Sequence, residues 1–185
     1  MARPAAATIA VLALGVAGCG GGGGSTSPAS PPNETGTTLG LNSTAFVDGA
    51  SIPKRYTCDG EGTSPPLTWS RVPSRAKSLA LTVEDPDATG GTFMHWSVWD
   101  IPRGSAGTNP GKVPPGSIQG ANSAGGNGYT GPCPPPGDPA HHYVFRIQAL
   151  DEDLGLKAGA SPDAVRTAIR QHSIASGTLT GRYKR

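Results

Sequence analysis

Two short stretches of the sequence hold ionisable side chains whose types could bind a small anion. Asp85 and Asp87 stand on either side of a proline at the end of an apolar run, and His95 lies in the apolar run that follows. His141 and Tyr143 come directly after a segment rich in glycine and proline. Imidazole N–H and phenol O–H groups donate hydrogen bonds that suit an anion, and carboxylates hold such donors in place. These residues form the candidate site.

The two aspartates need a specific arrangement in such a site, because a carboxylate repels an anion. The repulsion is relieved if the anion keeps a proton to donate, or if a protonated imidazole lies between the two charges. We expect one aspartate to accept a hydrogen bond from an imidazole and the other to brace the turn through backbone amides. In the alternative interpretations, Asp85 and Asp87 form a structural turn only, and His95 is a core residue among large apolar neighbours.

The sequence lacks the markers of the common hydrolases and metal enzymes. It has no G-x-S-x-G nucleophile elbow, no Walker loop, and neither H-E-x-x-H nor paired C-x-x-C spacing. His141 and His142 are adjacent on a predicted strand, so their side chains point to opposite faces and do not easily ligate one metal. We therefore predict a binding protein without a metal, a cofactor or catalytic residues.

The N-terminal residues have the pattern of an export signal rather than of a folded element. The apolar run from Ala5 to Ala17 is too short to span a membrane. Val16 to Cys19 resembles a bacterial lipobox, which implies acylation of Cys19 after cleavage. We predict a signal peptide over residues 1–18, a flexible Gly/Ser/Pro tether over 19–38, and an exported protein anchored by lipid to a membrane of the cell envelope. The alternative is an ordinary cleaved signal.

Two further cysteines, Cys58 and Cys133, follow the tether. Export exposes a chain to an oxidising compartment, where a pair can form a disulfide. Closing a loop of this length would stabilise the fold by about 4 kcal/mol on the chain-entropy model. The alternative, two separate buried thiols, stays open.

The rest of the chain is typical of a mainly β domain with one clear helix. Ser161 and Pro162 form a helix start, and the apolar spacing that follows predicts a helix that ends near residues 174–177. Residues 103–130 have little apolar pattern and predict a long loop. The net charge of +2 comes without a basic run, which argues against nucleic acid as a partner. Strands are predicted over residues 39–46, 67–69, 78–84, 92–101, 141–150 and 178–183.

Alternation along these strands predicts which candidate residues share a face. Asp85 continues the apolar face of the strand over residues 78–84. In the strand over residues 92–101, His95 is expected on the face opposite Trp96, and His141 should share its face with Tyr143. The residues expected beside His95 are Phe93, Ser97 and Trp99.

At these residues the chain resembles the phosphatidylethanolamine-binding protein (PEBP) family, and most closely its bacterial branch, often described as Raf-kinase-inhibitor-like. The resemblance runs from about residue 40 to the C-terminus, with several blocks in the family's order. The matching blocks are Tyr56–Gly60, Ser64–Trp69, Asp85–Ala88, Gly90–Trp96, and Gly128–Tyr129 through Tyr143–Phe145.

The resemblance implies a PEBP-like β-sandwich over residues 39–185, with antiparallel-rich sheets and one or two peripheral helices. It implies a small pocket for a phosphate-like anion or a phospholipid head group. Thr89 departs from the family's usual proline, and His142 from its common arginine. Cysteines at positions 58 and 133 also occur in intracellular relatives, which weakens the prediction of a disulfide. The pocket residues carried over are Asp85, His95, His141 and Tyr143, with Asp87 and Pro135 as near neighbours.

The resemblance favours a non-catalytic binding protein that regulates a partner by contact, such as a protease or a kinase. For an exported protein a protease or an envelope lipid is the better expectation. Bacterial relatives form homodimers, so a homodimer is also an expectation here. Two alternatives stay open: a hydrolase of phosphate esters that uses His/Asp pairs for proton transfer, and a structural envelope protein.

Overall fold

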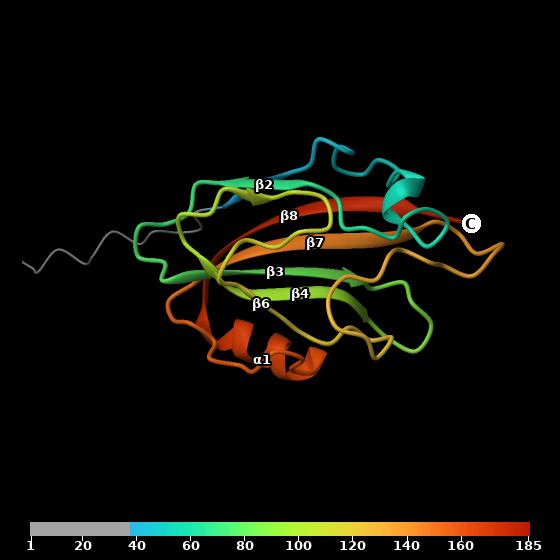
Figure 1. Ribbon diagram of the computed structural model, residues 1–185. Helices are drawn as coiled ribbons and strands as arrows, with labels where there is room; N and C mark the ends of the chain where they lie inside the picture. Colours follow the sequence, from blue (N-terminus) through green and yellow to red (C-terminus); the bar gives the residue numbers. More distant parts are fainter. Residues whose placement is uncertain (1–37) are drawn as a thin grey trace, which may run out of the picture. The chain divides into compact units, whose positions relative to one another are not determined.

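The computed structural model describes residues 38–185 of the chain, and two antiparallel sheets account for most of its regular structure (Figure 1). The smaller sheet has the strand order β1-β2-β5 and the larger sheet the order β6-β4-β3-β7-β8. The mainly β prediction with antiparallel sheets and one helix is therefore confirmed. The elements are β1 (Gly40–Asn42), a 3₁₀ turn (Lys54–Tyr56), β2 (Leu67–Ser70), β3 (Ser78–Asp85), β4 (Phe93–Pro102), β5 (Gly107–Thr108), β6 (Ile118–Gln119), β7 (His141–Leu150), α1 (Pro162–His172) and β8 (Ser173–Tyr183).

The predicted signal peptide, the lipobox at Cys19 and nearly all of the predicted tether lie outside the described residues. Within residues 38–185, no helix is long and apolar enough to cross a membrane.

The larger sheet is buried on both faces, because each face packs against a different layer. On one face, Leu81, Val83 and Phe145 pack with Leu67 and Trp69 of β2 to form the main core. The other face packs against α1, as Figure 1 shows by placing α1 and β2 on opposite sides of the molecule. That smaller cluster consists of Ala80, Trp99, Leu150, Val165 and Ile169. Two-sided burial explains why β3 is a nearly continuous apolar run.

The helix begins as the sequence predicts and ends earlier. The Ser161 hydroxyl accepts a hydrogen bond from the Ala164 N–H, and Pro162 occupies the first helical position. The helix ends at His172, and β8 begins at Ser173, several residues before its predicted start. The prediction of a helix to residues 174–177 was wrong because pairing with β7 takes up these residues as strand.

Two other expectations about regular structure also need correction. The first strand covers three residues, Gly40–Asn42, and not the whole predicted run over 39–46. The long segment over 103–130 is not a bare loop, since it contributes β5 to the smaller sheet and β6 to the edge of the larger sheet. Both strands have only two residues, which is too short for an alternating pattern to reveal.

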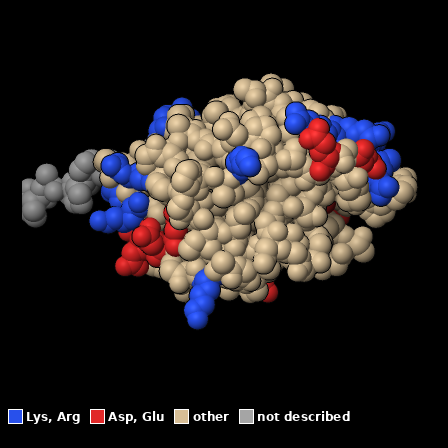
Figure 2. All heavy atoms as spheres, viewed as in Figure 1, with Lys and Arg blue, Asp and Glu red and all other residues tan. Residues whose placement is uncertain are grey.

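Charged side chains do not form one continuous basic surface on the face drawn in Figure 2. Lysine and arginine gather near both ends of this face with aspartate and glutamate beside them, and a broad central area has few charges.

A close backbone contact joins β8 to the segment before β1, and it requires a glycine. The Leu39 N–H donates to the Ser176 carbonyl at 3.1 Å, and a Cβ built on Gly177 would lie 2.1 Å from the Leu39 carbonyl oxygen. We expect Gly177→Ala to lower the free energy of unfolding by roughly 1–3 kcal/mol, because backbone atoms must move apart. Denaturant unfolding measures the change.

Gly104→Ala is the matched control, because a Cβ at Gly104 would meet no heavy atom within 4 Å. It should change the free energy of unfolding by no more than about 0.5 kcal/mol. Equal effects of the two substitutions would contradict the proposed contact.

Candidate anion-binding site

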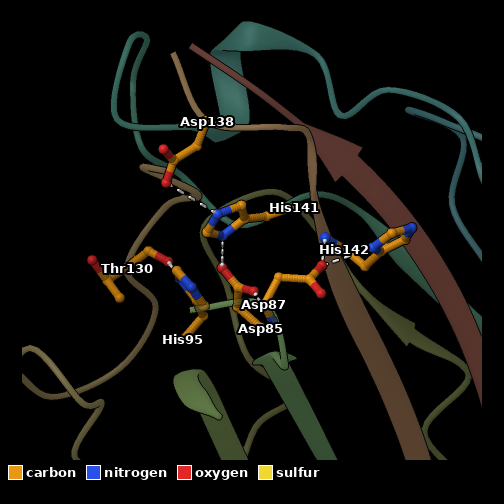
Figure 3. Close-up of polar contacts among 7 residues, drawn as sticks. All are labelled: Asp85, Asp87, His95, Thr130, Asp138, His141 and His142. Carbon is orange, nitrogen blue, oxygen red and sulfur yellow. Dashed lines mark hydrogen bonds and ion pairs between the residues drawn. The ribbon is translucent and has the colours of Figure 1, made fainter. Parts of the chain in front are cut away.

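The candidate residues converge where β3 ends and where β4 and β7 begin (Figure 3). Asp85 is the last residue of β3, His95 lies near the start of β4, and His141 is the first residue of β7. The rings of His95 and Tyr143 meet edge to face with their centroids 5.2 Å apart. A cavity of about 290 Å³ opens here, and its lining includes Asp85, His95, Pro135, His141 and Tyr143.

A β-bulge places His95 in the cavity. Val83 pairs with Trp96 and Glu84 with Met94, so His95 is the extra residue of β4 at this point. Its ring contacts those of Phe93 and Tyr143. The expectation that His95 lies opposite Trp96, beside Ser97 and Trp99, was therefore wrong. Trp99 packs on the helix side of the sheet, whereas Trp96 belongs to the main core together with Tyr143.

Asp85 holds both the neighbouring imidazole and the turn. Its Oδ2 lies 2.8 Å from His141 Nδ1, and its Oδ1 accepts a hydrogen bond from the Asp87 N–H at 2.8 Å. A carboxylate only accepts, so Nδ1 of His141 carries the proton and Nε2 is its second polar atom. Asp138 Oδ2 lies 3.9 Å from that Nε2. Asp138 was missed by the sequence analysis, although it precedes His141 closely in the same polar segment.

His95 is held in one tautomer by a backbone carbonyl. Its Nδ1 lies 2.9 Å from the Thr130 carbonyl oxygen, which can only accept, so Nδ1 carries the proton. Burial is the main cause that lowers the pKa of His95 below its ordinary value. The neutral ring therefore presents Nε2 as an acceptor. No pattern in the sequence identifies Thr130, because it contributes its backbone carbonyl to the site and not its side chain.

Tyr143 supplies a buried hydroxyl beside the Asp85 carboxylate. The side chain is fully buried, and its Oη has no hydrogen-bond partner within residues 38–185. Burial raises the pKa of the Tyr143 phenol, so the group stays protonated and remains a donor. A buried polar atom without a partner is unusual in a folded protein, and here it borders a cavity.

Asp87 lies outside the lining of the cavity and binds His142 instead. Its Oδ2 accepts from the backbone N–H of His142 at 2.7 Å and lies 2.7 Å from Nδ1 of the same residue. These bonds, the backbone one first, lower the pKa of Asp87. Figure 3 shows His142 directed away from His141, as strand alternation predicts. The structure therefore does not support the prediction that Asp87 contacts a ligand in this cavity.

A disulfide between Cys58 and Cys133 fixes the rim of the cavity. Cys133, Pro134 and Pro135 line the cavity, and the bond ties them to the segment that follows the 3₁₀ turn. The Cys58 N–H also donates to the Pro132 carbonyl at 3.1 Å. The prediction of a disulfide is confirmed, and the alternative of two separate thiols is wrong. Within residues 38–185, no cluster of three or more His, Cys, Asp or Glu side chains could hold a metal ion.

The comparisons with known proteins agree with this architecture. The family model described as phosphatidylethanolamine-binding protein matches residues 42–184. A UPF0098 protein of Methanothermobacter thermautotrophicus is 47% identical over 152 residues, which cover 80% of this chain and 99% of that protein. LppC of Mycobacterium tuberculosis, named as a lipoprotein, is 42% identical over 159 residues, which cover 86% of this chain and 79% of LppC.

A solved structure supports the same conclusion. Escherichia coli YbcL, described as a new member of the mammalian PEBP family, superposes with a TM-score of 0.76 at 35% identity. The match covers 80% of this chain and 98% of YbcL. At this identity the likeness extends beyond the shared fold to a common family.

The lowered pKa of His95 predicts a loss of stability in acid. The unfolded chain takes up the proton near the ordinary value of about 6.5, before the folded protein does. Stability is therefore lost as the pH falls from about 6.5 through the folded-state pKa, with a slope of at most about 1.4 kcal/mol per pH unit. Urea unfolding at pH 8 and pH 5 should show a smaller acid loss for His95→Gln than for the wild type.

The control for this experiment is His172→Gln, which changes a partly exposed histidine bound to Asp151 outside the cavity. Because this ring lies 3.1 Å from Asp151 and 3.6 Å from Glu152, its removal should not reduce the acid loss. An acid loss in His95→Gln that equals the wild-type loss would contradict the assignment.

Proposed function

The chain belongs to the phosphatidylethanolamine-binding protein family, and we propose that it binds a phosphate group, free or in a phospholipid head group, without turning it over. The buried hydroxyl of Tyr143 is the observation that carries the proposal, because it borders a cavity and forms no well-aligned hydrogen bond, with the Asp85 carboxylate as the acceptor near it. An anionic oxygen in the cavity would satisfy it. Hydrogen bonds to charged groups are worth about 1.5–3 kcal/mol each.

The protonation states of the two histidines indicate which anion suits the cavity. Each Nδ1 is already bonded, His141 to Asp85 and His95 to the Thr130 carbonyl. Each ring therefore has only its Nε2 left, and that atom can donate to an anion only when it carries a proton. A phosphate can supply a proton of its own, or it can bind together with a proton that goes to an imidazole. Either route offsets the repulsion from Asp85.

The lining favours binding over turnover. It includes no serine, and its cysteine is already bonded to Cys58. The histidines and Asp85 could move a proton, and a nucleophile other than water would have to come from one of these groups, Tyr143 or a threonine hydroxyl. We therefore treat hydrolysis of a phosphate ester as the alternative that the binding experiment must also test.

We further propose that the protein is held at a membrane by a lipid on Cys19. Support comes from the lipobox-like sequence and from LppC, the relative that is named as a lipoprotein. A lipid anchor would keep the domain among phospholipid head groups, which raises the effective concentration of a head-group ligand.

We expect Tyr143→Phe to weaken the binding of glycerophosphoethanolamine by roughly 10- to 100-fold, because it removes one hydrogen bond to a charged oxygen. His141→Ala should abolish the binding of glycerophosphoethanolamine. Isothermal titration calorimetry on the purified chain measures both. Tyr129→Phe is the matched control, because its hydroxyl donates to the Tyr56 carbonyl and does not line this cavity.

Wild-type affinity in Tyr143→Phe would refute the proposal. Phosphorus NMR of the same mixtures tests the alternative, since a binding protein leaves the ligand intact. Release of a product that stops in Asp85→Asn would show a hydrolase instead.

Binding should also be coupled to proton uptake. The charge of the phosphodiester in glycerophosphoethanolamine does not change between pH 5 and 8, so any change in affinity comes from the protein. Burial lowers the pKa of His95 in the free protein, and a bound anion would raise it again. Affinity should therefore increase as the pH falls between these two values, by at most about tenfold per pH unit. Calorimetry in buffers of different ionisation enthalpy counts the protons, and His95→Gln should reduce the count.

A further inference from the structure

We propose that a second cavity, on the opposite face of the large sheet, binds a small oxyanion through arginine side chains. The cavity has a volume of about 160 Å³ and lies between β3, β7 and α1. Its position follows from strand pairing, because Gln148 pairs with Ala80 and Ala80 belongs to the core on the helix side of the sheet. The polar residues that line it are Thr82, Glu84, Arg146, Gln148, Arg166 and Arg170.

One of the three arginines is already neutralised. Arg166 Nε lies 2.6 Å from Glu84 Oε1, and its guanidinium also bonds Asp163 at 3.0 Å and the Thr92 carbonyl at 3.2 Å. These bonds hold α1 against β3 and leave Arg166 little capacity for a further anion. Its charge is offset by the two carboxylates, so Arg166 fixes the wall of the cavity.

The other two arginines have no such partner. Within residues 38–185, neither Arg146 nor Arg170 forms an ion pair with a carboxylate, and Arg170 bonds only the Thr167 hydroxyl. Arginine stays protonated at any physiological pH. The lining therefore has two positive charges without a carboxylate partner, one on the half-buried Arg146 and one on the exposed Arg170. Guanidinium groups bind oxyanions with paired N–H donors, which suits a phosphate, sulfate or carboxylate group.

A buried amide also lines this cavity. Gln148 is only 6% exposed, it lines the cavity, and its Oε1 is fully buried with no hydrogen-bond partner within the described chain. A buried polar atom without a partner is unfavourable by about 1–3 kcal/mol. The amide oxygen is an acceptor, so the two guanidinium groups, and not this oxygen, supply the donors for an oxyanion.

The volume limits the ligand to a small group. A cavity volume of about 160 Å³ suits one tetrahedral or carboxylate group. The chemistry also differs from that of the first cavity. Guanidinium donors do not titrate between pH 5 and 8, so binding here should not depend on pH, whereas binding at His95 should.

Inorganic sulfate is the best probe, because its charge is constant over this range and it has no proton to donate to neutral histidines. We expect the side-chain Nε–H signals of Arg146 and Arg170 to shift on titration into the purified full chain, and to saturate with one dissociation constant at both pH 6 and pH 8. Phosphate and acetate, titrated separately, then distinguish a preference for tetrahedral anions from one for carboxylates.

The variant that tests the proposal is Arg146→Gln with Arg170→Gln, which should weaken sulfate binding at least tenfold. The Gln148 side-chain amide signals remain in this variant and report binding locally. Arg103→Gln with Lys112→Gln is the matched control, since it removes the same charge from exposed residues outside the cavity and should retain wild-type affinity.

Signals of Arg146 and Arg170 that shift linearly without saturation, or equal weakening in the two double variants, would overturn the proposal. His141→Ala separates the two cavities, because it should abolish binding of glycerophosphoethanolamine and leave sulfate binding at the arginines unchanged. Failure at one cavity can therefore be told from failure at the other.

Discussion

The hydrogen bond between Asp85 and His141 is the constraint on which the candidate site depends. It joins the last residue of β3 to the first residue of β7, and both side chains are almost completely buried. The same carboxylate accepts a hydrogen bond from the Asp87 N–H. One buried acid therefore fixes the tautomer of His141, the turn after β3, and the contact between the end of β3 and the start of β7. Removing one partner of a buried pair leaves the other without compensation, which is strongly unfavourable. The position of Tyr143, two residues farther along β7, follows from this junction, while the disulfide fixes the rim.

Side chains along β7 point alternately into two different environments. His141, Tyr143, Phe145 and Ile147 are buried on the face that meets the smaller sheet, while Arg146 lies on the face toward α1. Both cavities are therefore built on one strand whose pairing with β3 and β8 fixes its register. A shift of register by one residue would exchange the two sets of side chains, so the main core and both cavities depend on the same pairing.

The sequence predicts those parts of the fold that depend on local patterns. The bounds of β7 match the prediction, β3 differs by one residue, and Ser161 caps α1 as expected. The family match and the disulfide are confirmed. The bulge at His95 could not be predicted, because it arises from pairing with β3 and leaves no mark in the alternation of β4.

The sequence also could not predict the roles of residues that depend on the fold around them. Asp85 combines the two roles that we had divided between Asp85 and Asp87, since only the geometry of the turn decides which carboxylate points inward. Thr130 acts through its backbone carbonyl. Asp138 comes within 3.9 Å of the His141 ring because the fold brings the two residues together. The two-residue strands β5 and β6 likewise form through pairing with β2 and β4.

Two of the few unsatisfied polar atoms belong to residues that line the two cavities for which we propose ligands. Within the described chain, only Ser97 Oγ, Tyr143 Oη and Gln148 Oε1 are buried without a hydrogen bond. The latter two lie on β7, on opposite faces of the sheet, and each lines a cavity that also contains histidine or arginine. Folding normally pairs such atoms, because leaving them dry is unfavourable. The two cavities for which we propose ligands differ in the charge they offer, since that of a histidine depends on proton uptake and that of arginine is permanent.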